Sequence, residues 1–143
     1  MKMISLLLVD DDPVYRYIVQ CYLHEWWGEE TTVVGMVDHG VEAAARAQEL
    51  RPDIVLIDLG LRDVPGLEVI QQLRQALPKL GIIALGQLNI DGYRQAAEQA
   101  GADEFVSKVR VADELMPAVR RVMEPKQTQG EAAKEEVTGQ AIP

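Results

Sequence analysis

Short apolar runs alternate with segments of helical periodicity along this chain, from its first residues to about Met123. A strand that is buried on both faces of a parallel sheet reads as a continuous apolar run, whereas a helix shows apolar residues at every third or fourth position. The alternation of the two patterns is typical of βαβ units. It predicts an α/β fold in which a doubly wound, five-stranded parallel sheet carries five helices on its two faces.

The apolar runs and their boundaries place the elements. The first run ends in three consecutive aspartates, and Pro13 then suits the first turn of a helix, because a missing N–H leaves nothing unpaired there. The predicted strands are Ile4 to Val9, Thr32 to Val37, Ile54 to Asp58, Ile82 to Leu85 and Asp103 to Ser107. The residues expected to face the core from the five helices are Val14, Ile18, Cys21 and Tyr22; Val41, Ala44, Ala45 and Leu50; Leu67, Ile70, Leu73 and Leu77; Ala96, Ala97 and Ala100; and Leu115, Met116, Val119, Val122 and Met123.

Length and composition limit the domain organisation. A chain of 143 residues has room for one domain, which we expect over residues 1–123. Large apolar residues become rare from Glu124 onward, which predicts a flexible tail over residues 124–143.

Charge and cysteine content exclude several classes of function. The formal net charge of −9 argues against direct nucleic-acid binding, since a duplex binder needs clustered Lys and Arg. Cys21 is the only cysteine, which excludes an internal disulfide and a Cys-based structural zinc site. The apolar segment Ile4 to Val9 is too short for a signal-peptide core or a membrane span. We therefore expect a cytoplasmic protein without membrane contact.

Charged side chains gather at the ends of the predicted strands. Asp10 and Asp11 follow the first strand, Asp58 ends the third, and Lys108 follows the fifth. The carboxyl ends of parallel strands meet at one edge of the sheet, where ligands bind in such folds. Three carboxylates in a partly dehydrated cleft repel one another unless a cation lies among them, and oxygen ligands suit Mg²⁺. The sequence therefore predicts a magnesium site at this edge, where Lys108 balances the remaining charge or holds an anionic oxygen.

Each of these residues also has a purely structural explanation. Acidic residues after a strand often cap the next helix, and we expect Asp12 to be such a cap. A lone aspartate such as Asp58 can form a turn. His24 and His39 lack a second ligand at metal-binding spacing and are expected to be exposed. The location of the strand-end residues at one edge of the sheet favours the functional interpretation.

Three segments resemble the receiver domains of response regulators in two-component signalling, whose fold is flavodoxin-like (CheY-like). They are Leu6 to Pro13, Pro52 to Leu61 together with Gly66, and Gly101 to Lys108. Their order and spacing are similar to those of the family from about Met3 to Met123.

The resemblance implies a role for each strand-end residue. Asp58 would accept a phosphoryl group, and Lys108 would contact that group. The metal ligands would be Asp10, Asp11, Asp58 and the backbone carbonyl of Gly60. Phe105 would be the aromatic switch residue, which moves inward on phosphorylation. The chemistry is consistent, because a carboxylate attacks another anion poorly unless a metal neutralises charge on the phosphoryl group.

Three positions depart from the family pattern. Gly86 stands where receivers usually have a Thr or Ser whose hydroxyl bonds a phosphoryl oxygen. Losing a hydrogen bond of about 0.5–1.5 kcal/mol, or about twice that if charge-assisted, predicts a reduced or altered switch. Val109 follows Lys108 where a Pro with a cis bond is usual, so we expect a trans bond there. Arg62 replaces a common Pro after Asp58.

The resemblance implies a phosphorylation switch rather than a turnover enzyme. Such a phosphoprotein would take a phosphoryl group from a histidine kinase or phosphotransfer protein, lose it by hydrolysis, and switch binding to an unidentified downstream protein. One alternative is a receiver that works as a phosphorylation-independent interaction module, which Gly86 and Val109 favour. Another is a phosphohydrolase of the haloacid dehalogenase type, because Asp10 and Asp12 resemble its D-x-D motif. The last helix could support a homodimer, and the short remainder predicts a stand-alone receiver or one separated from its effector.

Overall fold

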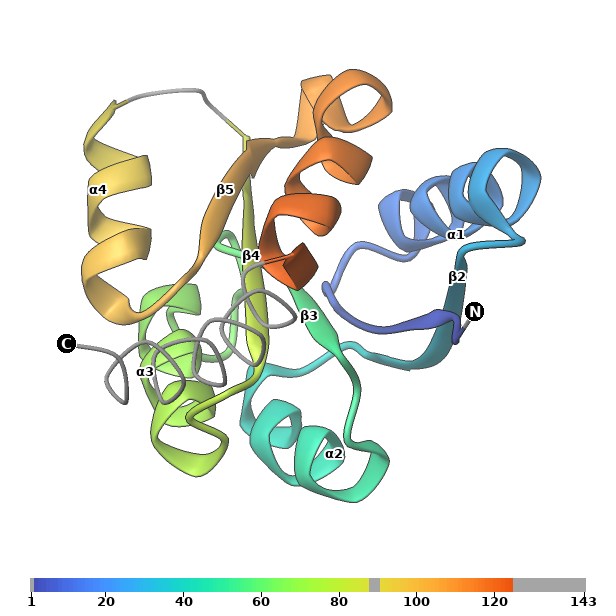
Figure 1. Ribbon diagram of the computed structural model, residues 1–143. Helices are drawn as coiled ribbons and strands as arrows, with labels where there is room; N and C mark the ends of the chain where they lie inside the picture. Colours follow the sequence, from blue (N-terminus) through green and yellow to red (C-terminus); the bar gives the residue numbers. More distant parts are fainter. Residues whose placement is uncertain (1, 88–90, 125–143) are drawn as a thin grey trace, which may run out of the picture.

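In the computed structural model, which describes residues 2–87 and 91–124, five parallel strands form one sheet (Figure 1). They are β1 (Ile4–Val9), β2 (Thr31–Val37), β3 (Ile54–Asp58), β4 (Gly81–Gly86) and β5 (Glu104–Ser107), in the spatial order β2-β1-β3-β4-β5. The order reverses between β1 and β3, so the carboxyl ends of these strands flank the switch point where ligands bind in such sheets. The final described residue, Glu124, is still helical, and the rest of the expected tail lies outside the described residues.

Helices cover both faces of the sheet. They are α1 (Pro13–Trp27), the short helix η1 (Gly40–Glu42), α2 (Ala43–Leu50), α3 (Gly66–Ala76), α4 (Asp91–Ala100), the short helix η2 (Lys108–Arg110) and a C-terminal helix over residues 111–124. α1 and the C-terminal helix pack into the core on one face, and α2, α3 and α4 into the core on the other (Figure 1). The predicted doubly wound α/β fold is confirmed. None of the described helices has both the length and the apolar character to cross a membrane.

Residues of β1 alternate between the two cores, because successive side chains of a strand point to opposite faces. Leu7 and Val9 enter the core that α2, α3 and α4 cover, and Leu6 and Leu8 enter the core under α1. All four are at most 3% exposed. Burial on both faces explains the unbroken apolar run in the sequence.

The inner face of α1 differs from the prediction. Val19 and Leu23 are 2% and 1% exposed, whereas the expected core residues Val14 and Ile18 are 65% and 54% exposed. The other two expected residues, at positions 21 and 22, are half-buried. Apolar residues surround this helix on several sides, so their spacing is compatible with more than one inward face, and tertiary packing selects the buried one.

The inner faces of the later helices follow the prediction except in α2. There Ala43 and Ala47 are buried, while the expected Ala45 is exposed, as is the expected Val41 in the preceding η1. The expected residues that are buried in α3 and the C-terminal helix are Ile70, Leu73, Leu115, Met116, Val119 and Val122. Gly101 ends α4 with a φ of +122°, a conformation that glycine adopts without a steric penalty.

Candidate functional site

Three carboxylates converge at the carboxyl ends of β1 and β3. Asp10 and Asp11 directly follow β1, and Asp58 is the last residue of β3, in which Ile57 pairs with Val9. One carboxylate oxygen from each acid lies within 4.8 Å of the others. Asp10 and Asp58 are 3% and 4% exposed, and Asp11 is half-buried. The structure therefore brings the three acids together at one edge, as predicted.

A backbone N–H group binds one oxygen of each carboxylate. The donors are the N–H of Asp12 to Asp10 Oδ1 (2.8 Å), of Gly60 to Asp58 Oδ1 (2.9 Å) and of Arg62 to Asp11 Oδ2 (2.9 Å). Hydrogen bonds to ionised acceptors are short and directional, so they fix the orientation of each side chain. The bond from Arg62 also ties the loop after β3 to the segment after β1.

The ammonium group of Lys108 lies among these acids. Its Nζ donates a hydrogen bond to Asp10 Oδ2 at 2.9 Å and lies 3.3 Å from Asp58 Oδ2. Lys108 follows β5, two strands away from β3, yet only 8% of it is exposed. One ammonium group offsets the charge of one carboxylate, so the cluster retains a surplus of negative charge.

Burial raises the pKa of Asp10 above its usual value, because a desolvated carboxylate loses the water that stabilises its charge. The charge of Asp58 adds to this rise, while the Asp12 N–H and the Lys108 ammonium oppose it. The net rise in pKa means that Asp10 takes up a proton more readily than an exposed carboxyl group does.

The donor set fits a hard divalent cation. Mg²⁺ prefers oxygen ligands and keeps several waters, so it needs only a few protein ligands. Asp10, Asp11 and Asp58 bring three carboxylates within reach of one ion, and the charge that Lys108 leaves uncompensated is that of two carboxylates. The residues present therefore fit the predicted magnesium site.

Gly86, the last residue of β4, borders the site on its other side. A cavity of about 120 Å³ is lined by Leu59, Gly60, Gly86, Gln87 and Tyr93. The register partner of Gly86 on β5 is Ser107, whose buried hydroxyl has no hydrogen-bond partner in the described part of the chain. Position 86 therefore lies at the wall of this cavity and opposite Ser107 in the register of the sheet.

Phe105 lies apart from the carboxylates. Its ring belongs to the core on the side of α3 and α4 and is 2% exposed. The guanidinium carbon of Arg94 lies 5.3 Å from the ring centroid. The expected switch residue is thus already inward in this conformation.

Asp12 stands outside the carboxylate cluster. Its side chain accepts hydrogen bonds from the N–H groups of Val14 (3.0 Å) and Tyr15 (3.3 Å). This confirms its predicted role as the cap of α1. The geometry also counts against the D-x-D interpretation, which needs Asp10 and Asp12 to act together.

Sequence reasoning missed Tyr15, in the first turn of α1. Its hydroxyl donates a hydrogen bond to the backbone carbonyl of Lys108 at 2.9 Å, and Lys108 Nζ lies 4.3 Å from its ring centroid. The bond between Lys108 and Val109 is trans, as predicted, since the described residues contain no cis bond. No motif connects Tyr15 with Lys108, because the two are 93 residues apart and only the fold brings them together.

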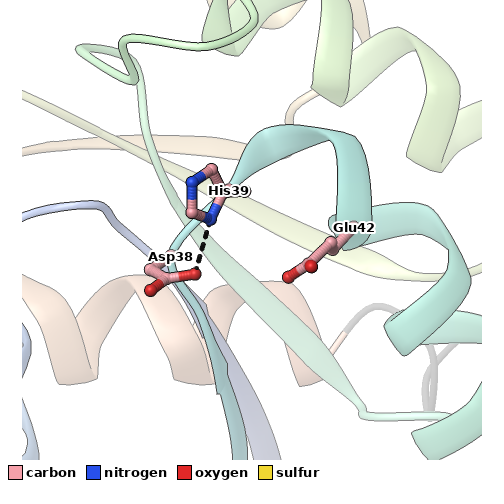
Figure 2. Close-up of side chains that lie close together, drawn as sticks. All are labelled: Asp38, His39 and Glu42. Atoms are coloured by element: carbon pink, nitrogen blue, oxygen red, sulfur yellow. Dashed lines mark hydrogen bonds and ion pairs between the residues drawn. The ribbon is translucent and has the colours of Figure 1, made fainter.

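A second group of metal-ligating side chains lies after β2 (Figure 2). His39 Nδ1 is 2.7 Å from Asp38 Oδ1, and Glu42 of η1 completes three ligand atoms within 4.8 Å of one another. His39 is exposed as expected, but the expectation that it lacks a neighbouring ligand is wrong, because the η1 turn brings Glu42 beside it. Since all three side chains are exposed, we assign no ligand to this group.

Comparison with known proteins agrees with the geometry. Residues 6–120 match the response regulator receiver domain family. The response regulator protein VraR of Staphylococcus aureus is 34% identical over 118 residues, which cover 82% of this chain and 56% of VraR. The chain therefore spans little more than half the length of the curated relatives that it matches.

Solved structures share the fold. The response regulator domain of CheB from Thermotoga maritima is 25% identical, with a TM-score of 0.77 over 86% of this chain and 98% of that one. A two-component response regulator of the LuxR family from an Aurantimonas species is 27% identical, with a TM-score of 0.78 over 95% of this chain and 99% of that one. The strand order, the converging acids and these matches agree, and the chain belongs to the receiver domain family of two-component response regulators.

Proposed function

We propose that this domain accepts a phosphoryl group on Asp58 in a magnesium-dependent reaction and thereby switches the binding of a partner protein. The observation that carries the proposal is the convergence of three carboxylates and one ammonium group at the switch point of the sheet. Membership of the receiver family supports the same conclusion.

We assign Asp58 as the nucleophile. The N–H of Gly60 holds Oδ1, and Oδ2 faces Lys108, so we assign the attack to Oδ2. Attack forms a bond from this oxygen to phosphorus while the bond to the donor's leaving group breaks. Hydrolysis of the acyl phosphate by water later restores the carboxylate, so the domain modifies itself and is not a turnover enzyme.

The surrounding groups would neutralise negative charge during phosphoryl transfer. Bound Mg²⁺ would neutralise charge on the phosphoryl group, which lowers the repulsion between two anions. Asp10, Asp11, Asp58 and the carbonyl of Gly60 are the groups that we assign to hold it. Lys108 would turn from the carboxylates to a phosphoryl oxygen, for which a compact ammonium group on a flexible stem is suited.

Intact mass spectrometry tests this proposal. Incubation with Mg²⁺ and acetyl phosphate should add one phosphoryl group to the wild type, and either EDTA or Asp58→Asn should abolish the addition. Asp12→Asn is the matched control, because Asp12 is a neighbouring acid that caps α1 outside the cluster. A wild-type protein that gains no phosphoryl group would overturn the proposal.

The donor that we propose in the cell is a histidine kinase or a phosphotransfer protein, and the reader of the switch is a downstream protein. The net charge of −9 makes nucleic acid an unfavourable direct partner for this chain. A cytoplasmic location is consistent with a single cysteine that needs no oxidising compartment.

A second candidate function is partner binding without phosphorylation. It is favoured by the inward position of Phe105, since that residue is expected to move inward on phosphorylation and is already buried here. Phe105 is the only phenylalanine in the chain, so a fluorinated phenylalanine label reports on it alone. A fluorine resonance that stays unchanged when Mg²⁺ and the phosphoryl mimic beryllofluoride bind would favour this second function.

A further inference from the structure

We propose that Tyr15 positions Lys108 for its contact with the phosphoryl group, by holding both the ammonium group and the backbone of that lysine. The inference rests on the proposed function, because it assumes that Lys108 meets a phosphoryl oxygen. Tyr15 comes from the first turn of α1 and Lys108 from the end of β5, so the contact joins two elements of the site.

The first contact is between the ring and the ammonium group. Lys108 Nζ lies 4.3 Å from the centroid of the Tyr15 ring and 2.9 Å from Asp10 Oδ2. A cation within about 6 Å of an aromatic face is attracted by the electrons of that face. A metal cation that neutralises the carboxylates would weaken their attraction for the Lys108 ammonium group. The attraction of the neutral Tyr15 ring for the same group would remain. The ring therefore keeps the ammonium group at the site when its carboxylate partners are engaged elsewhere.

The second contact holds the backbone. The Tyr15 hydroxyl donates a hydrogen bond to the carbonyl oxygen of Lys108 at 2.9 Å. The next residue, Val109, is 79% exposed, so its side chain gives this segment little packing support. Receivers resembling this chain usually have a Pro at that position, which restricts the backbone. Here the bond from α1 supplies a restraint that Val109 cannot.

The phenol stays a donor while the acids are ionised. Burial raises the pKa of Tyr15, and the charges of Asp10 and Asp58 raise it further. A neutral phenol can donate to the Lys108 carbonyl, whereas a phenolate would repel both the carbonyl and the acids. The hydrogen bond is thus compatible with the charge state that phosphoryl transfer requires.

Affinity for beryllofluoride at saturating Mg²⁺ tests the assignment. Tyr15→Leu should weaken binding about tenfold, because it removes both contacts. Tyr15→Phe keeps the ring and should weaken binding about threefold. Tyr22→Phe is the matched control, since Tyr22 also lies on α1 and donates to a backbone carbonyl, that of Ala112, at 2.8 Å; it should change the affinity less than about twofold.

Two further measurements separate positioning from a merely structural role. Tyr15→Leu should cause no additional loss of beryllofluoride binding in a Lys108→Met background, and it should leave the affinity for Mg²⁺ alone unchanged. An equal loss in both backgrounds, or a parallel loss of Mg²⁺ affinity, would overturn the assignment.

The test also distinguishes failure of this inference from failure of the proposed function. Absence of beryllofluoride binding to the wild type would overturn the proposed function. Urea unfolding of the metal-free Tyr15→Leu and Lys108→Met proteins and of the double variant then decides whether Tyr15 holds Lys108. Non-additive effects would support the contact, and additive effects would overturn it.

Discussion

The ammonium nitrogen of Lys108 lies 2.9 Å from Oδ2 of Asp10, and the two side chains are only 5% and 4% exposed. Desolvation of two charges is costly, so each buried charge is stable only while a counter-ion remains beside it. The same ammonium group neutralises part of the charge that would attract a metal cation. A bound cation would therefore share with Lys108 the neutralisation of the carboxylates, which would make stability and metal binding interdependent.

Lys108→Met should lower the stability of the metal-free protein by about 3 kcal/mol, because it leaves buried carboxylates without a counter-ion. Mg²⁺ should restore a large part of the lost stability, because it would neutralise the carboxylates in place of Lys108. Urea unfolding in EDTA and in Mg²⁺ measures both effects. Arg110→Met is the control, since Arg110 pairs with Glu114 at the surface and should change stability by about 0.5 kcal/mol or less. An equal loss for Lys108→Met in EDTA and in Mg²⁺ would contradict the shared role.

Asp10→Asn should stabilise the metal-free protein near neutral pH. Folding raises the pKa of Asp10, so the folded state favours the protonated acid, and this stabilisation is lost as the pH rises through the folded pKa. The variant has no charge to desolvate, and Asp58 remains as a counter-ion for Lys108. Its advantage over the wild type should shrink as the pH falls toward the usual carboxyl value of 3.8. A variant that is less stable than the wild type at neutral pH would show that attraction to Lys108 outweighs the burial of the charge.

Strands β1, β3 and β4 were predictable because residues that are buried on both faces of a sheet form an unbroken apolar run. β3 reads as an apolar run that ends in Asp58, and every residue in it is buried. The inward face of α1 was not predictable in the same way. Its apolar residues occur on several sides of the helix, so periodicity alone cannot separate the exposed Val14 and Ile18 from the buried Val19 and Leu23.

In the site, too, residues at strand ends were predictable, whereas contacts made by helices were not. Asp10, Asp58 and Lys108 sit at strand ends, and the ends of parallel strands share one edge, so their meeting follows from the fold class. Tyr15 approaches Lys108 from a helix, and its contact depends on how α1 rotates and docks. Glu42 likewise lies close to His39 only because of the tight η1 turn, which is not predictable from the sequence.

Gly86→Thr should strengthen the coupling between the site and Phe105. The substitution places a hydroxyl beside the cavity of about 120 Å³ next to Gly60, where a bond to a phosphoryl oxygen becomes available. One such bond should tighten beryllofluoride binding about fivefold and enlarge the shift of a fluorine label on Phe105. Gly86→Val is the matched control, because valine has the shape of threonine without the hydroxyl. If both variants behave alike, added volume rather than the hydrogen bond would be responsible.

Gly66→Ala should weaken both the fold and the phosphorylation site. A Cβ at Gly66 would lie 2.6 Å from the Cα of Leu59 and 2.9 Å from the carbonyl oxygen of Asp58. Both neighbours are backbone atoms, so relief requires the start of α3 to move away from the strand end that carries Asp58. We expect a loss of about 2 kcal/mol in the free energy of unfolding, together with slower phosphorylation by acetyl phosphate.

Gly92→Ala provides the contrast, because a Cβ at Gly92, in α4, would meet no atom within 4 Å. Replacing glycine by alanine in a helix without a clash should raise stability by about 0.5–1 kcal/mol. The Gly92 variant should therefore gain stability and keep the wild-type rate of phosphorylation, whereas the Gly66 variant should lose both stability and rate. Urea unfolding and intact mass measure the two quantities. Equal stabilities of the two variants would mean that the close approach of α3 to the end of β3 is not needed to hold Asp58 in place.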